Sequence, residues 1–445
     1  MPRTTNKPKR LAASALLILL FGSIAGAATL TVDPTGHGDF TTIQDAIHAA
    51  AFGDEVLVGC GVYFENIVMQ NGRHVRGEDR NCAIIDGGRS GSVVTFPELG
   101  VATGLSDLTI RNGFTQGNGG GIRIEGGSPT ITRNLILDNR ARDGGGIYLR
   151  SNGDPAISGN IIEGNHSTQS GGGIHASQVQ NAVITTNLIL SNSASFTGSS
   201  IHVSLADLEI VGNTFFGNTT EFYSAGIYAW NSTGLIGNNV FFRNTGLASY
   251  PSDLDAVDSS FTYASNISYA NNPSGTGFPS GVTLIDPQFV DEESLKPRSD
   301  SPLIDAATLG TYPALDVAGF PRSLDGDLDG LPVRDIGAVE NTGITRVTFD
   351  GDTLRWDEAL GTGVLYNVYR GDLQTLRTSG VYTQDPASIP QALESCLIAE
   401  GLVDDDVPAA GSAFFYLVTA VGSVESSLGF DATPTERPRT RNCGE

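Results

Sequence analysis

The stretch Asn134-Leu-Ile-Leu-Asp-Asn139 decides the fold, because the same six-residue pattern returns along the chain at a fixed interval. The copies, spaced 26 or 27 residues apart, are Asp107–Asn112, Asn134–Asn139, Asn160–Asn165, Asn187–Asn192, Asn213–Asn218, Asn239–Asn244 and Asn266–Asn271. A constant period of this size is typical of proteins built from stacked repeats, in which each unit packs on its neighbours.

Two further signals keep step with the Asn pattern. A small residue precedes Ile at Gly121-Ile122, Gly146-Ile147, Gly173-Ile174, Ser200-Ile201 and Gly226-Ile227, and an apolar residue recurs at Ile131, Ile157, Ile184, Ile210 and Ile236. Each repeat holds three short β-rich pieces and no long helical pattern, which predicts a parallel β-helix with coils stacked at about 4.8 Å. We expect the Asn residues to form columns at the turns, because a short amide tolerates unusual backbone angles and satisfies neighbouring amides.

The residues ahead of the repeats predict a cap. Residues 41–51 are Ala-rich, with Ile43 and Ile47 on one helical face, and such a helix can cover the open end of the strands. The run from Gly38 to Ile47, followed by Gly61-Val-Tyr-Phe-Glu65, resembles the opening of the pectin-lyase-like, right-handed parallel β-helix superfamily. The resemblance implies an all-β, right-handed solenoid with an N-terminal cap helix, which we assign to residues 28–290.

The N-terminus has the pattern of an export signal, assigned to residues 1–27. Cationic residues precede an apolar run, Leu11–Ile24, and the small-x-small cleavage pattern Ala25-Gly26-Ala27. The run is shorter than the roughly 20 residues of a membrane span, and a retained anchor helix is the alternative. We expect no membrane span after signal cleavage, and a protein that is secreted or lies at the cell surface.

The charge and the cysteines agree with export. The 49 Asp and Glu residues outnumber the 26 Lys and Arg residues, and the net charge of −23 argues against nucleic acid and anionic membranes as partners. Four Cys residues allow three disulfide connectivities, of which the simplest pairs Cys60 with Cys82 and Cys396 with Cys443.

Residues 291–342 follow the last repeat and are expected to close the C-terminal end of the solenoid. An Asp-rich loop in this segment predicts a Ca²⁺ site formed by Asp325, Asp327 and Asp329, with Asp335 nearby, because alternating Asp residues aim several oxygens at one cation. The spacing departs from an EF-hand loop, so a solvated acidic loop is the alternative. No other cofactor is suggested.

Residues 343–445 no longer show the 26- to 27-residue pattern. Apolar or alternating runs of strand length occur around Trp356, Tyr366–Arg370 and Phe414–Val418. They predict a small antiparallel β-sandwich, and the segment resembles a fibronectin type III module.

The strands after the Gly-Ile motif carry the candidate site. Strand alternation places Ile122 inside, so the next residue of each strand should form one outward column: Arg123, Tyr148, His175, His202 and Tyr228. A second outward column should contain Glu125, Arg150, Ser177, Ser204 and Trp230. Aromatic rings beside polar groups suit sugar rings, so Arg123, Tyr148, His175, His202, Tyr228 and Trp230 predict a carbohydrate-binding face. A purely structural face is the alternative.

A further column predicts a docking strip. Leu137, Leu190, Phe216, Phe242 and Tyr269 lie beside the inward Ile136 series and should face outward. Such an apolar strip would receive the C-terminal segment or another chain.

Three functions remain open at this point. The first is a protein that binds polysaccharide or cell-surface glycan, or acts as a surface interaction module, without catalysis. The second is a polysaccharide lyase or glycoside hydrolase that works in a groove on the solenoid, with His175, His202, Arg150 and Glu125 as catalytic candidates. A simple Glu125–Arg150 ion pair is the plainer interpretation of two of these residues. The third is a purely structural protein of the cell surface.

Overall fold

The structure is a computed structural model of the chain. It describes residues 27–98, 103–246, 253–269, 279–298, 300–322, 331, 333–341, 347–350, 353–356, 365–399, 401–404, 406–408, 413–421, 437 and 442–443. The expected export signal and the three loop residues Asp325, Asp327 and Asp329 lie outside these ranges.

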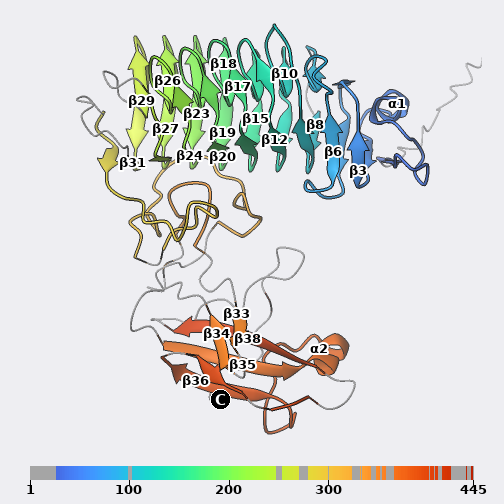
Figure 1. The fold of residues 1–445 in the computed structure, drawn as a ribbon, viewed down its shortest axis with the longest axis vertical. Coiled ribbons are helices and arrows are strands. Elements are labelled where there is room, and N and C mark those ends of the chain that lie inside the picture. The colour runs from blue at the N-terminus through green and yellow to red at the C-terminus, as the bar shows by residue number, and fades with distance from the viewer. Residues whose placement is uncertain are drawn as a thin grey trace, which may run out of the picture.

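The chain winds as a right-handed solenoid, and the strands of successive coils stack into four parallel sheets (Figure 1). Sheet 1 contains β1 (Thr29–Val32), β2 (Glu55–Val58), β5 (His74–Gly77), β8 (Gly104–Ser106), β11 (Thr130–Thr132), β15 (Ala156–Ser158), β19 (Ala182–Thr185), β23 (Asp207–Val211), β27 (Thr233–Gly237) and β30 (Ser260–Ala264). Sheet 2 contains β4 (Ile67–Val68), β7 (Val94–Phe96), β10 (Ile122–Ile124), β14 (Ile147–Leu149), β18 (Ile174–Ser177), β22 (Ile201–Ser204), β26 (Ile227–Trp230) and β29 (Leu254–Val257).

The other two sheets complete each coil. Sheet 3 contains β3 (Gly61–Tyr63), β6 (Ala83–Asp86), β9 (Thr109–Arg111), β12 (Leu135–Leu137), β16 (Ile161–Glu163), β20 (Leu188–Leu190), β24 (Thr214–Phe216), β28 (Val240–Phe242), β31 (Asn266–Tyr269) and β32 (Val282–Leu284). Sheet 4 is short, with β13 (Arg140–Ala141), β17 (His166–Ser167), β21 (Ser193–Ala194) and β25 (Thr219–Thr220). A coil therefore runs from sheet 1 through sheets 3 and 4 to sheet 2.

The core consists of the apolar columns that the sequence predicts. Ile122, Ile147, Ile174, Ile201 and Ile227 are paired in register and fully buried, as are Ile131, Ile157, Ile184, Ile210 and Ile236. Each buried Ile side chain stabilises the fold by about 1.5–3 kcal/mol. Space beside the Ile column is so small that a Cβ atom on Gly121 would lie 2.7 Å from the carbonyl oxygen of Gly146.

The Asn residues form two fully buried columns, as predicted. In the first, Asn134, Asn160, Asn187, Asn213, Asn239 and Asn266 donate or accept side-chain hydrogen bonds of 3.0–3.1 Å from coil to coil. The second contains Asn139, Asn165, Asn192, Asn218 and Asn244. It ends on Asp253, whose carboxylate accepts from Asn244 and from the Ser268 hydroxyl.

The predicted reason for Asn at the turns is only half right. In both columns the left-handed backbone angle belongs to the residue before the Asn, with φ of 57° at Arg133, 53° at Asp138 and 58° at Thr186. The predicted first copy, Asp107–Asn112, is wrong by one residue, because Thr109 pairs with Leu135, and its two end residues therefore take the left-handed positions. The Asn itself serves through its amide, which pairs with the next coil and with a backbone carbonyl. Hydrogen bonding, rather than tolerance of strain, explains the residue type.

A cap helix covers the first coil. Helix α1 (Ile43–Ala49) is shorter than the expected residues 41–51 and buries Ile43, Ala46 and Ile47 completely. The Glu65 carboxylate accepts the backbone N–H groups of Ile43 and Gln44 at 2.8 and 2.9 Å, which satisfies the start of the helix. These bonds tie the helix to the first coil.

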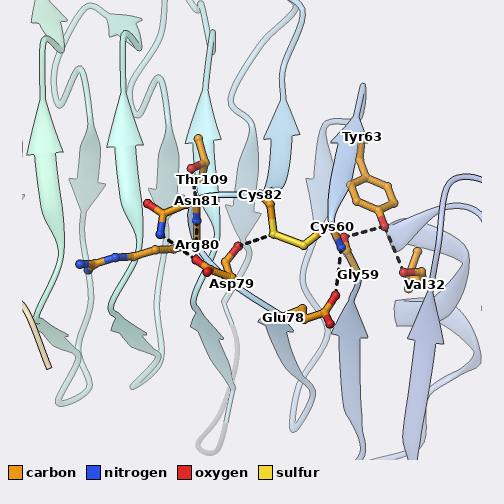
Figure 2. The surroundings of a disulfide bond; sticks show 10 residues. All are labelled: Val32, Gly59, Cys60, Tyr63, Glu78, Asp79, Arg80, Asn81, Cys82 and Thr109. Carbon is orange, nitrogen blue, oxygen red and sulfur yellow. Dashed lines mark hydrogen bonds between the residues drawn. A yellow bond between two sulfur atoms is a disulfide. The ribbon is translucent and has the colours of Figure 1, made fainter. Parts of the chain in front are cut away.

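Both disulfides have the expected partners. Cys60 and Cys82 join neighbouring coils ahead of β3 and β6, with their Cα atoms 4.7 Å apart (Figure 2). Cys396 and Cys443 are also bonded, with a Cα separation of 5.7 Å.

The segment after the last coil packs along the flank of the solenoid, on sheet 3. Leu295, Val317 and Ala338 form a buried cluster with Leu188, against which Leu190 and Phe216 also pack. The Phe289 ring lies 5.4 Å from that of Phe242, edge to face. The predicted docking strip is therefore confirmed at three of its five residues, Leu190, Phe216 and Phe242. Its occupant is the following segment of the same chain, which we call the flank segment, residues 286–341.

A network of buried charges holds the flank segment together. The Arg322 guanidinium lies 3.2 Å from Glu340 and donates to the carbonyl oxygens of Asp335 and Gly337. Asp335, one of the four expected Ca²⁺ ligands, is 1% exposed, and its carboxylate accepts the backbone N–H groups of Asp305 and Asn341. Burial raises the pKa of Asp335 to about 7.

The C-terminal module contains two antiparallel three-stranded sheets. One is formed by β33 (Val347–Asp350), β34 (Thr353–Trp356) and β37 (Leu402–Val403), and the other by β36 (Leu393–Ile398), β35 (Leu365–Asp372) and β38 (Phe414–Val421). Leu354, Tyr366, Val368, Val418 and Ala420 form its core, and Trp356 packs against them. Helix α2 (Leu373–Ser379) was not expected from the sequence. In the described part of the chain, no helix has the length and apolar character that crossing a membrane requires.

Candidate functional site

The first outward column of sheet 2 forms as predicted. Arg123, Tyr148, His175, His202 and Tyr228 pair in register on consecutive coils. The rings stack face to face, with centroid separations of 5.4 Å between Tyr148 and His175, 4.6 Å between His175 and His202, and 5.4 Å between His202 and Tyr228. Parallel pairing thus turns a 26-residue sequence period into a continuous stack of rings.

The column is less open than the sequence predicts. Tyr148 is 7% exposed and His175 is 9% exposed. The cover is a row of polar residues that lies five positions ahead of the rings in each coil: Asn118, Asp143, Ser170 and Thr197. We call it the polar row. Thr197 Oγ1 lies 2.8 Å from His202 Nδ1 and donates to Ser170 Oγ at 2.7 Å.

Further rings extend the stack to the surface. Tyr223 contacts Tyr228 at 5.7 Å and Phe196 at 5.9 Å, and Phe196 contacts Phe222 at 5.3 Å. Phe196 and Phe222 are 47% and 45% exposed, and Trp230, two residues after Tyr228 on the same strand, is 42% exposed. We call these eight side chains the aromatic face: Tyr148, His175, His202, Tyr228, Tyr223, Phe196, Phe222 and Trp230.

Sequence reasoning missed three members of this face. Phe196 and Phe222 each stand five residues before the inward Ile of their coil, Ile201 and Ile227, and Tyr223 follows directly. Aligning the repeats on the Ile would have revealed the shared position. Contact with the predicted column was not visible, because it depends on how the loop folds back over the strand.

The second outward column forms over its last three residues, and the charged residues predicted for its start pair differently. Ser177, Ser204 and Trp230 are in register, and Ser204 donates to Ser177 at 3.1 Å. Glu125, directly after β10, pairs with Arg123 of that strand at 2.5 Å, not with Arg150 as the plainer interpretation had it. The pair is half exposed, so it contributes at most about 1 kcal/mol.

A shallow pocket opens beside this column. It has a volume of about 220 Å³, and Glu98, Glu125, Arg150 and Gln178 are among the residues that line it. Two carboxylates and a guanidinium thus face one small space.

The two imidazoles of the stack are neutral near pH 7. Burial lowers the pKa of His202 to about 3, and the neighbouring His175 adds to this effect. Burial also lowers the pKa of His175, against the opposing influence of the Asp143 carboxylate. Both rings can therefore exchange hydrogen bonds with a ligand, but neither carries the proton that a general acid must supply at neutral pH.

No cluster of three or more His, Cys, Asp and Glu side chains suited to a metal ion occurs among the residues that the structure describes. The Ca²⁺ site expected at the Asp-rich loop rests on three residues outside those ranges and stays a prediction.

Comparison with known proteins supports the architecture. Residues 61–245 match the family model described as the right-handed beta helix region. No curated protein matches the sequence. Among solved structures, a pectate lyase, Pel9A, is 12% identical, with a TM-score of 0.41 over 72% of this chain and 97% of that chain.

Two pectin methylesterases are also similar. The enzyme from carrot is 14% identical, with a TM-score of 0.36 over 59% of this chain and 89% of its own. The enzyme PemA from Erwinia chrysanthemi is 14% identical, with a TM-score of 0.28 over 58% of this chain and 92% of its own. Similarities of this size carry no information about activity. The family match, together with four parallel sheets of stacked coils, identifies the central part of this chain as a right-handed parallel β-helix.

Proposed function

We propose that the protein binds polysaccharide through the aromatic face. The observation that carries this proposal is the unbroken series of seven rings, joined by six contacts, from buried Tyr148 to exposed Phe222, with Trp230 beside it. Such a series fixes the exposed rings on a rigid base, so little conformational entropy is lost when a ligand binds. Flat apolar rings with hydroxyls and imidazoles alongside match the apolar faces and hydroxyl edges of sugars.

The charges around the face favour an uncharged glycan. Two of the nearby guanidinium groups are paired within the protein, Arg123 with Glu125 and Arg142 with Asp143 at 2.9 Å. The chain as a whole carries a net charge of −23, which repels acidic polysaccharides. A neutral glycan is therefore the ligand class that we propose.

Binding is tested with a panel of soluble neutral and acidic polysaccharides, by affinity electrophoresis and calorimetry. We expect Phe196→Ala and Trp230→Ala to weaken binding by roughly 30-fold each, which corresponds to about 2 kcal/mol for an exposed anchoring ring. Phe64→Ala is the matched control, because Phe64 is 77% exposed on the first coil. Absence of binding to every glycan, or equal losses in the control, would refute the proposal and favour a purely structural role.

One observation favours the alternative of catalysis. The pocket lined by Glu98, Glu125 and Arg150 brings acid and base groups together next to the proposed binding face. A lyase or hydrolase would release unsaturated products or reducing ends from the polysaccharide that binds. Loss of this release in Glu125→Gln and Arg150→Ala, with binding intact, would establish the protein as an enzyme.

We also propose that the protein is exported and acts outside the cytoplasm. The two disulfides support this location, because such bonds persist in oxidising compartments. Detection of the chain in the culture medium or on the cell surface, with its N-terminus at Ala28, tests the proposal.

A further inference from the structure

Two members of the polar row, Asn118 and Asp143, and the neighbouring ring of His175 bring three polar groups together in a place that solvent reaches poorly. Asn118 Oδ1 and His175 Nδ1 are buried atoms without a hydrogen-bond partner. Asp143 Oδ1 lies 3.8 Å from His175 Nδ1, too far for a hydrogen bond. Asn118 and Asp143 are paired on adjacent coils, so their side chains lie next to each other along the row.

The surroundings satisfy these groups only in part: the Asn118 side chain lies against the Tyr148 hydroxyl, and the His175 ring interacts with the backbone of Ser170. Asp143 also forms an ion pair with Arg142, whose Nε contacts the other carboxylate oxygen, Oδ2, at 2.9 Å. The Asp143 side chain is 13% exposed and the His175 side chain 11% exposed, so bulk water reaches them poorly. Each unsatisfied buried polar atom costs about 1–3 kcal/mol. A bound group that contacts both Asn118 Oδ1 and His175 Nδ1 would therefore stabilise the folded protein.

We propose that Asn118, Asp143 and His175 bind a divalent transition-metal ion, with Zn²⁺ as the best match. Two ligand atoms on a tetrahedral Zn²⁺ with bonds of about 2.0–2.1 Å stand about 3.4 Å apart, close to the separation of the Asp143 and His175 atoms. One imidazole nitrogen with two oxygens is a borderline donor set that favours Zn²⁺ over Ca²⁺, which takes six to eight oxygens. Three protein ligands leave a fourth position for water.

The metal site shares His175 with the aromatic face, but metal binding itself can be measured whether or not the protein binds a glycan. His175 stacks between Tyr148 and His202, and the Asn118 side chain lies against the Tyr148 hydroxyl. A bound ion would fix the ring of His175 and stiffen the buried end of the stack.

Metal titration of the full chain tests the proposal. After treatment with EDTA, we expect calorimetry to give one Zn²⁺ per chain, and Co²⁺ to produce the visible absorption bands of a nitrogen-containing site. Asp143→Asn and His175→Gln should each weaken Zn²⁺ binding by at least about 100-fold, since each removes a direct ligand.

His202→Gln is the matched control, because His202 occupies the next rung of the same stack but its Nδ1 already bonds Thr197. It should leave Zn²⁺ binding unchanged. The proposal is wrong if the wild-type chain binds no Zn²⁺, or if Asp143→Asn binds Zn²⁺ as tightly as the wild type. In that case a trapped water, or a Nδ1 proton shared with Asp143, satisfies the row. The titration of the wild-type chain tests the proposal even if a variant fails to fold.

Discussion

Replacing Asn187 by Ala should destabilise the solenoid more than any surface change of the same size. The Asn187 amide nitrogen donates to Ile157 O, Thr185 O and Asn213 Oδ1 at 2.9–3.1 Å. Its Oδ1 accepts the backbone N–H of Asn160 and the Asn160 amide, at 2.9 and 3.0 Å. The residue is fully buried, so water cannot replace these partners.

The expected loss follows from the groups that are left unpaired. The N–H of Asn160 loses its side-chain acceptor and stays buried, and the Ile157 carbonyl loses a donor. At about 1–3 kcal/mol for a stranded buried group, with a small cavity in addition, we expect a loss of about 3–4 kcal/mol in the free energy of unfolding. Asn152→Ala is the control, because Asn152 is exposed between two coils.

Urea unfolding followed by circular dichroism measures the difference. Hydrogen exchange at the Asn160 amide gives a local measure that does not depend on two-state unfolding, which repeat proteins can violate. A change below about 0.5 kcal/mol, with the Asn160 amide still protected, would refute the reasoning that buried amide columns hold the coils together.

Four further predictions follow from the packing. Burial raises the pKa of Asp253 from an ordinary 3.8 to about 6, so the folded state should gain stability as the pH falls through 6 towards 4, by roughly 3 kcal/mol, and Asp253→Asn should flatten this profile in urea titrations. Glu65→Ala removes the acceptor for two N–H groups of helix α1, and should lower the free energy of unfolding by about 1–2 kcal/mol, measured against Phe64→Ala. Replacing Cys60 and Cys82 together by Ser should cost about 3 kcal/mol, and an unchanged melting temperature would contradict this. Leu295→Asp puts a charge into the buried contact of the flank segment, and limited proteolysis should then cut residues 286–341 before the solenoid.

The sequence predicted those parts of the fold that repeat. A period of 26 or 27 residues fixes which side chains share a column, and strand alternation fixes which columns are inside. The inward Ile columns, the Asn columns and the stacked rings from Tyr148 to Tyr228 all follow from these two rules. The cap helix and the disulfide partners follow from local patterns.

The other parts of the fold depend on contacts that do not recur from coil to coil, so the repeat period does not predict them. The polar row reaches over Tyr148 and His175 because the loop before sheet 2 folds back, and no sequence pattern states how far it reaches. The flank segment packs on the apolar strip, where Leu190 and Phe216 contact it. Its own sequence has no repeat, so the sequence does not predict which of its residues make these contacts. The Arg123–Glu125 pair forms between residues two positions apart, at the end of β10, where both side chains lie on the outer side of the coil.

The chain has two Trp residues, and this makes a direct test of the proposed binding face possible. In Trp356→Phe, Trp230 is the only fluorescent indole, and it stands 42% exposed at the edge of the aromatic face. We predict that a neutral polysaccharide shifts its emission to shorter wavelength in a saturable manner, and that Phe196→Ala in the same background weakens the response by roughly 30-fold. An emission spectrum that no glycan changes, in a chain that remains folded, would contradict the account.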